Sequence, residues 1–394
     1  MKKIIFITFF LFFITFFSFA ATFFNGYTGI ATSLQPNENS KIPIMTSQAF
    51  FAGQFDISGL FQLRTELSVD TENILEKGFF QRTPAYFSID EISITTRFNA
   101  NKSSHFIAAF LGKYESIGSD LFLQRQFGIK PINSLITETW LGLAGSEIYP
   151  FSGLGLAYMA RFSSPQALAG YFYANKKDDI LNLNCDLRFG GVGNIASLDF
   201  AAGVSFPVET KDQYGNDVFI LIRSVDFHTG FSFLVGNRNT TSLFLQGGLK
   251  KLRLNPEADE KRMKLSDIYF IIEPRFIAAN IHFYFSLFCI PEEMCSKLFY
   301  IPHQIGCNLS IFNEKLHIGT LPLKIGTHIT LSAPDVTLQN INELADNTLS
   351  LHIAPFTYIN MFGGTLNFAL NLDVLNIKEF YKSLKFTIGF KNQL

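Results

Sequence analysis

One histidine and one serine stand four residues apart in the segment His228-Thr-Gly-Phe-Ser232. A serine activated by a histidine base is the nucleophile of many hydrolytic enzymes. In an extended segment the two side chains share one face, but about 13 Å separates them along the strand. That distance is too long for a direct hydrogen bond. We therefore expect no catalytic pair at this position and no enzymatic activity.

Three further histidines, His282, His328 and His352, lie in segments that alternate between polar and apolar residues. Imidazole groups invite a metal-site hypothesis, because histidine is a common zinc ligand. No HxH or HxxxH spacing brings two of them together, so wetted polar residues are the favoured interpretation. The sequence also lacks the G-x-x-x-x-G-K-[ST] phosphate-binding loop. We expect neither a metal ion nor a cofactor.

The four cysteines, Cys185, Cys289, Cys295 and Cys307, match no zinc-binding spacing. Cys289 and Cys295 flank a short predicted loop and would be able to form a disulfide in an oxidising compartment. The alternative is that all four are apolar side chains on or near a lipid-facing surface.

The composition is unusually apolar for a chain of 394 residues. Charged residues make up 16% and hydrophobic residues 47%, with 46 phenylalanines, whereas soluble domains carry about 25% charged residues. Apolar side chains must therefore face a large core or lipid. The formal net charge is −1, so no basic surface for nucleic acid is expected.

Residues 1–20 have the pattern of an export signal. Lys2 and Lys3 precede an apolar run, and Ser18-Phe19-Ala20 places small residues where a signal peptidase cleaves. The alternative is an uncleaved membrane anchor. No cysteine follows the run, so a lipoprotein anchor is not supported. We expect a signal peptide over residues 1–20 and export from the cytoplasm.

Period-two alternation dominates the rest of the chain and predicts strands. It is clearest in four segments, at residues 61–69, 181–189, 366–374 and 384–390. It is weaker in others, namely residues 92–98, 154–162, 198–206, 227–235, 281–289, 305–311 and 321–331. No later run is long and apolar enough for a spanning helix. The rhythm breaks in two predicted loops, residues 115–140 and 255–264; the first is expected to be able to fold into the lumen.

These patterns predict an all-β fold, a closed antiparallel transmembrane β-barrel of about 14–18 strands, with 16 as the best guess. Residues 21–45 look irregular and are expected to be a periplasmic lead-in or short plug, and residues 46–394 the barrel. The polar faces of its strands would point into the lumen. The predicted pore-lining residues are Arg64, Glu66, Arg97, Arg161, Asp186, Arg188, Asp199, Glu273, Arg275, His282, Lys324, His328, Asp373 and Lys385.

Opposite charges facing one another across a pore create a transverse field, which orders water and selects polar solutes. The alternative is a filled lumen, in which the same residues form buried ion pairs and no solute passes.

The leader, the alternating segments and the final strand at residues 384–390 resemble bacterial outer-membrane β-barrel proteins, porins among them. Many such proteins end on an aromatic residue that the assembly machinery recognises, whereas here Lys391-Asn-Gln-Leu394 follows Phe390. Phe-Leu-Gln-Arg-Gln-Phe-Gly128 and the many phenylalanines are similar to uncharacterised spirochaete outer-membrane proteins. The resemblance implies a place in the outer membrane, contact with its lipid, and insertion by the barrel assembly machinery.

Three functions follow as hypotheses. The first is a passive channel for small polar or amphipathic solutes. The second is a plugged barrel that serves as a surface adhesin or scaffold, with residues 115–137 and 255–264 as binding loops. The third is a soluble periplasmic β-protein. Porins are often trimers, so a homo-oligomer is a further expectation of the resemblance.

Overall fold

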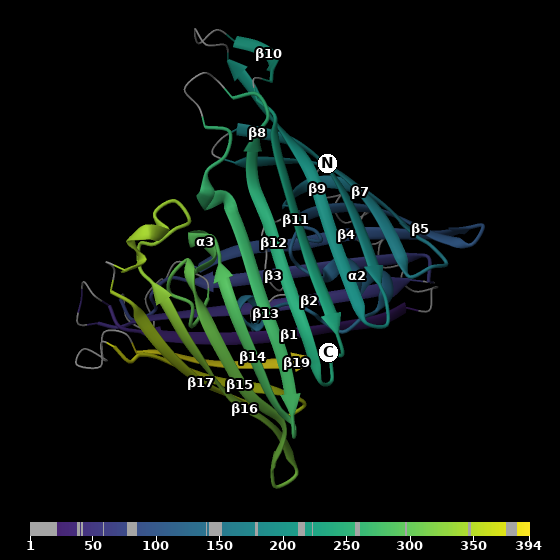
Figure 1. Ribbon diagram of the computed structural model, residues 1–394. Coiled ribbons are helices and arrows are strands. Elements are labelled where there is room, and N and C mark those ends of the chain that lie inside the picture. Colours follow the sequence, from purple (N-terminus) through teal and green to yellow (C-terminus); the bar gives the residue numbers. More distant parts are fainter. Residues whose placement is uncertain are drawn as a thin grey trace.

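The computed structural model describes residues 22–37, 40, 42–57, 59–76, 85–138, 140–141, 152–177, 180–211, 217–222, 224–256, 261–295, 298–345, 348–375 and 384–394. The leader predicted over residues 1–20 lies outside these ranges. Antiparallel strands dominate the described part of the chain (Figure 1).

The strands are long enough to cross a bilayer when tilted, since about 9–11 residues suffice. The first nine are β1 (Thr22–Gln35), β2 (Ile44–Ile57), β3 (Phe61–Thr71), β4 (Ala85–Ala100), β5 (Ser103–Lys113), β6 (Ser152–Arg161), β7 (Gln166–Lys177), β8 (Ile180–Val192) and β9 (Ala196–Lys211). The others are β10 (Asp217–Leu221), β11 (Asp226–Gly236), β12 (Thr241–Arg253), β13 (Ile268–Ala278), β14 (Ile281–Cys289), β15 (Ile305–Ile318), β16 (Leu321–Ala333), β17 (Ser350–Met361), β18 (Gly364–Asp373) and β19 (Lys385–Gln393).

Short helices lie in the connections. They are α2 (Leu121–Phe127), η1 (Leu135–Thr137), η2 (Leu265–Asp267), α3 (Glu292–Cys295) and η3 (Ile341–Ala345). No helix among the described residues is long and apolar enough to span a membrane.

The sheet closes on itself. Strands that follow one another in the sequence pair antiparallel, and β1 pairs with β19, so that Tyr27 faces Gln393 and Leu34 faces Phe386. Among the described strands, only β10 lies outside the ring, because it pairs with the end of β9 while β9 also pairs with β11. The described residues therefore form a closed antiparallel barrel of eighteen strands. This confirms the predicted fold class, and the count exceeds the best guess of 16 by two.

The N-terminal part of the barrel differs from its prediction. The sequence predicts an irregular lead-in or plug over residues 21–45, whereas the structure forms β1 from Thr22 onward. The outward side of β1 mixes threonines with Ile30 and Leu34, and its inward side carries the aromatic Tyr27 beside small residues. The contrast between the two faces is too weak for the alternation rule. Pairing with both β2 and β19 makes this segment a strand.

The two ends of the barrel differ in their connections. At one end, here called the short-turn end, the strands are joined by turns of two to four residues, and β1 starts and β19 finishes there. At the other end, called the long-loop end, most connections are longer and hold every helix of the described chain. In outer-membrane barrels the short turns face the periplasm.

Apolar side chains point out of the barrel and polar ones point in. Along β8, Leu187 is 69% exposed, while its neighbours Asp186 and Arg188 are 0% and 1% exposed. A soluble protein with a dry core would show the reverse. The outer face is thus suited to hydrocarbon, in which every backbone donor and acceptor needs an internal partner.

The connection between β5 and β6 folds into the barrel. Its described residues, 114–138 and 140–141, are called the lumen insertion. Ile117, Phe122 and Leu123 are buried in a cluster that includes Tyr171 and Phe244 from the barrel wall. Residues 115–140 were predicted as a break in the strand rhythm that could enter the lumen, and the insertion does so.

Candidate functional site in the barrel lumen

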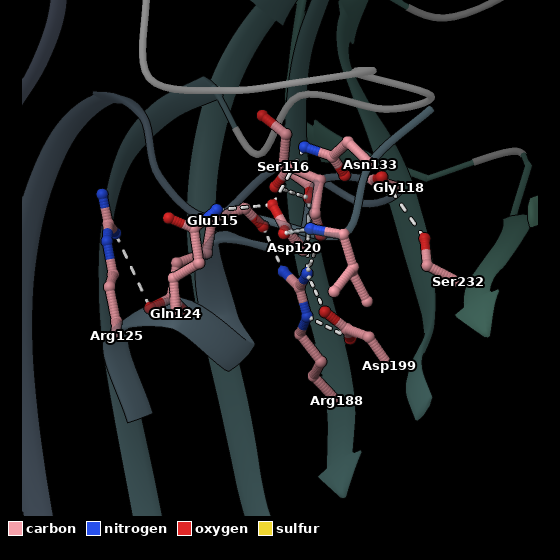
Figure 2. Close-up of polar contacts among 12 residues, drawn as sticks. Glu115, Ser116, Gly118, Asp120, Gln124, Arg125, Asn133, Arg188, Asp199 and Ser232 are labelled. Carbon is pink, nitrogen blue, oxygen red and sulfur yellow. Dashed lines mark hydrogen bonds and ion pairs between the residues drawn. The ribbon is translucent and has the colours of Figure 1, made fainter. Parts of the chain in front are cut away.

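Arg188 of β8 fastens the start of the lumen insertion (Figure 2). Its guanidinium donates two hydrogen bonds of 2.7 Å to the carboxylate of Asp199 on β9. It also donates to the backbone carbonyl of Glu115 and, at 3.0 Å, to that of Ser119. An arginine fork suits such a planar set of acceptors. One buried cation therefore binds both the wall and the insertion.

Other arginines fasten the rest of the insertion. Arg125 of α2 pairs with Glu91 of β4 at 2.6 Å. Arg161 of β6 donates to the carbonyl of Gln126 at 2.6 Å. Arg275 of β13 is paired with Glu273 at 2.7 Å and donates to the carbonyls of Ile132 and Asn133 at 3.1 and 2.8 Å. These bonds span the insertion from its start to residue 133.

His228 and Ser232 do not pair with each other. His228 Nε2 lies 2.6 Å from Asp186 Oδ1 of β8. Ser232 Oγ instead donates to the carbonyl of Gly118 at 3.3 Å and accepts from Gln246 at 3.2 Å. Both side chains thus help to hold the wall and the insertion, and no nucleophile–base pair forms between them.

The histidines also stay apart. His282 stacks on Phe312 with ring centroids 4.5 Å apart, and His328 stacks on Tyr300 at 3.9 Å. His352 lies 3.0 Å from Asn371 Oδ1. Within the described ranges no group of three or more His, Cys, Asp or Glu residues is arranged to hold a metal ion.

Cys289 and Cys295 are buried free thiols in this structure. Burial raises the pKa of the Cys295 thiol, which lies in a loop helix, to about 12. A thiol with a raised pKa is a weak nucleophile at neutral pH. The disulfide between the two stays a prediction.

All fourteen predicted pore-lining residues occupy inward positions of their strands, but they do not converge on one point. Five of them, Arg161, Arg188, Asp199, Glu273 and Arg275, hold the insertion directly or through one another. Arg97 is exposed near the turn after β4, and Asp373 lies at the far end of β18. Buried ion pairs, as in the filled-lumen alternative, therefore occupy the β4–β14 side of the barrel.

The other side of the lumen holds two cavities. One, of about 920 Å³, is lined mainly by β1 to β4, the insertion and β16 to β19 and is called the long-loop cavity. The other, of about 820 Å³, lies toward the short-turn end and is called the short-turn cavity. Leu121 at the start of α2 lines both. The insertion thus forms the boundary between two cavities stacked along the barrel.

The long-loop cavity has walls of opposite charge. Carboxylates from β3 and β4 line one part of it, namely Glu66, Asp70, Asp90 and Glu91, with a cation, Lys113 of β5, among them. Glu66 Oε1 and Asp90 Oδ2 are buried with no hydrogen-bond partner among the described residues. On the other part, Lys385 of β19 lies 5.3 Å from the ring of Phe299.

Two more lysines line the lumen nearby. Lys324 of β16 lies 4.3 Å from the ring centroid of Phe312, and Lys391 of β19 lies 3.7 Å from that of Tyr27. Aromatic faces attract such cations. Lys391, Asp90 and Glu91 were not among the predicted pore-lining residues, although Lys391 continues the inward alternation of Lys385 along β19.

The last described residues of the insertion reach the far wall. Glu138 lines the long-loop cavity, and enclosure there raises the pKa of its carboxyl, although Lys324 and Lys391 pull that pKa down. Trp140 stacks on Tyr358 of β17 at 5.1 Å. Neither Glu138 nor Trp140 was predicted as a site residue, and the break in the strand rhythm was the only signal for this segment.

Two glycines make room for this end of the insertion. A Cβ atom on Gly389 of β19 would lie 2.5 Å from Trp140 Nε1, and one on Gly29 of β1 would lie 2.5 Å from Leu141 Cδ2. Contacts this short force a side chain to move. The insertion is therefore fitted to a notch at the seam between the first and last strands.

We expect Gly389→Ala to displace Trp140 from this notch. Trp140 is the only tryptophan in the sequence, so its fluorescence reports on the insertion alone. The emission maximum of Trp140 should shift to longer wavelength, and iodide should quench its fluorescence more strongly. Gly170→Ala is the matched control, because a Cβ there meets Leu187 at an ordinary 3.8 Å. An unchanged spectrum in the Gly389 variant would contradict the packing described here.

No protein-family model matches the chain, and no curated protein matches it. Its structure is similar to that of OccAB2 of Acinetobacter baumannii, with a TM-score of 0.52 and 9% identity over 95% of this chain and 98% of that one. OccAB3 of the same organism gives a TM-score of 0.50 and 9% identity over 94% and 99% of the two chains.

A triple mutant of a porin from Rhodopseudomonas blastica aligns with a TM-score of 0.46 and 9% identity, over 95% of this chain and 100% of that one. At such identities the likeness concerns the fold alone. The chain has a porin-like closed β-barrel.

Proposed function

We propose that this porin-like barrel lies in the outer membrane and is a passive channel for small polar or amphipathic solutes. The observation that carries the proposal is the pair of cavities, about 920 and 820 Å³, stacked along one side of the lumen. Eighteen strands are enough for an aqueous channel, since barrels of 16–18 strands commonly enclose one.

The charged side chains in the lumen support a role in selecting which solutes pass. Carboxylates of β3 and β4 and lysines of β16 and β19 line the same side of the lumen. A solute in this space meets opposite charges at once, in surroundings where water screens them poorly. The electrostatic interaction with these walls is most favourable for a polar molecule that aligns its dipole, or for one that carries both charges. Aromatic rings beside the lysines offer contact to an amphipathic solute.

The adhesin alternative is less well supported. It needs residues 115–137 as a binding loop, yet Glu115, Ser119 and Asp120 are 0% exposed inside the barrel. Of the second predicted binding loop, residues 255–264, the described positions 255 and 261–264 are exposed at the long-loop end. We infer further that the predicted leader exports the chain, that the assembly machinery inserts it, and that the short turns face the periplasm.

The direct test is conductance in planar lipid bilayers. Purified protein that shows heat-modifiable mobility, and is therefore folded, should insert in discrete current steps. A folded and inserted protein that passes no current would overturn the channel proposal.

Glu138→Gln should shift the channel's selectivity toward anions. The substitution removes a carboxylate that interacts with Lys324 and Lys391, so the electrostatic potential on this side of the lumen becomes more positive. The reversal potential under a potassium chloride gradient measures the shift. Because the pKa of Glu138 is raised, lowering the pH should move the parent channel in the same direction before ordinary carboxylates protonate.

The variant should respond less to pH than the parent, because one of the carboxylates that line the cavity is gone. Glu343→Gln is the control, since it removes the same charge from an exposed loop helix. Equal reversal potentials for the parent and the Glu138 variant would show that solutes do not pass this carboxylate.

A further inference from the structure

A hydrogen-bonded chain of three side chains lies on the outer face of the barrel, near the short-turn end. Ser103 Oγ, at the start of β5, is 2.8 Å from His105 Nε2. His105 Nδ1 is 2.7 Å from the hydroxyl oxygen of Tyr158 on β6. The hydroxyl of Ser103 also lies 2.9 Å from the carbonyl oxygen of Ala100, so its proton has two acceptors.

Strand register places the three residues outside the lumen. On β5, Ala108 and Phe110 point inward and are 0% and 2% exposed, whereas Ile107 is 46% exposed. Ser103 and His105 share the parity of Ile107. On β6, Tyr158 is 49% exposed. The chain of hydrogen bonds is therefore open to the surroundings of the barrel and not to its pore.

The neighbours of His105 hold its ring in place. Phe98 of β4 stacks on it with centroids 5.2 Å apart and planes 14° apart. Tyr158 lies 6.0 Å away at 21°. A base that is fixed from both sides loses little freedom when it acts, and preorganised geometry of this kind favours catalysis.

We propose that Ser103 and His105 form a lipid-facing hydrolase site, with Tyr158 as a positioning residue. The arrangement has a nucleophile within hydrogen-bond reach of a base, and a third group that orients the base. If Nδ1 donates its proton to the Tyr158 oxygen, Nε2 keeps a lone pair for the proton of Ser103. This site differs from the pair His228 and Ser232, whose side chains have separate partners in the structure.

The substrate class is the acyl ester of a glycerophospholipid, and this part of the inference rests on the proposed placement in a membrane. Phe98, Tyr158 and Phe162 are 43%, 49% and 40% exposed around the site. Aromatic side chains gather where headgroups meet acyl chains, which is the depth of the ester bonds. Lys102, exposed in the turn before Ser103, supplies a cation at the level of the lipid phosphates.

The reaction needs only lipid and water. Ser103 Oγ attacks the ester carbonyl while its proton passes to His105 Nε2. The bond between carbonyl carbon and glycerol oxygen breaks, and the leaving oxygen takes that proton, so that a lysophospholipid departs and an acyl ester stays on Ser103. Water then gives a proton to His105 and attacks the acyl carbonyl. The fatty acid leaves, and Ser103 regains its proton.

A fluorophosphonate probe tests the activated serine in detergent, without any need for a bilayer or a conducting pore. The hydroxyl displaces fluoride from phosphorus, and mass spectrometry locates the adduct. We expect modification at Ser103. Ser103→Ala should abolish it, and His105→Gln should slow it by about 10²-fold or more, as for loss of a general base. Ser47→Ala, which removes another outward-facing hydroxyl, should change nothing.

Tyr158→Phe keeps the ring that stacks on His105 and removes the hydroxyl. We expect slower labelling and an altered pH profile, with unchanged heat-modifiable mobility. Vesicles of phosphatidylethanolamine and phosphatidylglycerol then test the substrate, because Ser103-dependent release of fatty acid is expected.

Parent protein that labels no faster than the Ser103 variant, or a His105 variant that labels like the parent, would overturn the site. Labelling without fatty-acid release would overturn the phospholipid assignment. Neither outcome bears on conductance, so the channel proposal stands or falls separately.

Discussion

Replacing Arg188 with methionine is expected to lower the free energy of unfolding by about 3–5 kcal/mol, the usual cost of leaving one partner of a buried ion pair alone. Asp199 would keep a buried charge with no cation beside it. The carbonyls of Glu115 and Ser119 would lose their donor. Urea titration of the vesicle-inserted barrel, followed by the loss of its heat-modifiable form, measures the change.

Two controls make this result specific. Arg188→Met combined with Asp199→Leu should recover part of the loss, because apolar side chains can replace a buried ion pair without leaving a charge unpaired. Lys250→Met removes a surface pair with Glu293, whose side chain is 75% exposed, and should cost less than about 1 kcal/mol. If the single Arg188 variant unfolds at the parent's urea concentration, the guanidinium does not secure the insertion.

The second large effect concerns the width of the pore. Replacing residues 117–138 with a short Gly-Ser linker should raise the single-channel conductance several-fold. The segment fills the β4–β14 side of the lumen with buried side chains such as Phe122 and Ile132, and water would take their place. Arg275 and Glu273 stay paired with each other on the barrel wall, so the deletion leaves neither of these charged side chains without a partner.

A linker of similar length in place of residues 255–264, whose described positions 255 and 261–264 are exposed, is the control and should leave the conductance unchanged. Heat-modifiable mobility must persist in both proteins. A deletion variant that is folded and conducts like the parent would show that the insertion does not restrict the path of ions.

The barrel was predictable because its chemistry repeats every two residues. Asp186, Leu187 and Arg188 illustrate the rule, since each side chain points to the face that its polarity demands. Such a pattern predicts which side chains of a strand face the lumen without any knowledge of the neighbouring strands. It fails at β1, where Tyr27 and small residues inside and threonines outside remove the contrast between the two faces.

The site was less predictable because it depends on pairings between distant segments. Period-two reasoning placed His228 and Asp186 on inward faces, but it did not show that they pair, because they come from different strands. Trp140 and Glu138 belong to a segment with no period at all. Their positions follow from Arg188, Arg275 and the glycine notch, and these contacts are set only when the barrel has closed.

The ring closes between its first and last strands. β1 pairs with β19 over eight residue pairs, and the backbone of Leu394 donates to the carbonyl of Gly26. Until the last strand arrives, both flanks of the sheet expose unpaired amides and carbonyls, which is the state most prone to join another chain. A polypeptide that lacks β19 would thus expose the unpaired backbone of both β1 and β18. Proteases and chaperones of the cell envelope would therefore meet either a closed barrel or an open sheet that is prone to aggregate.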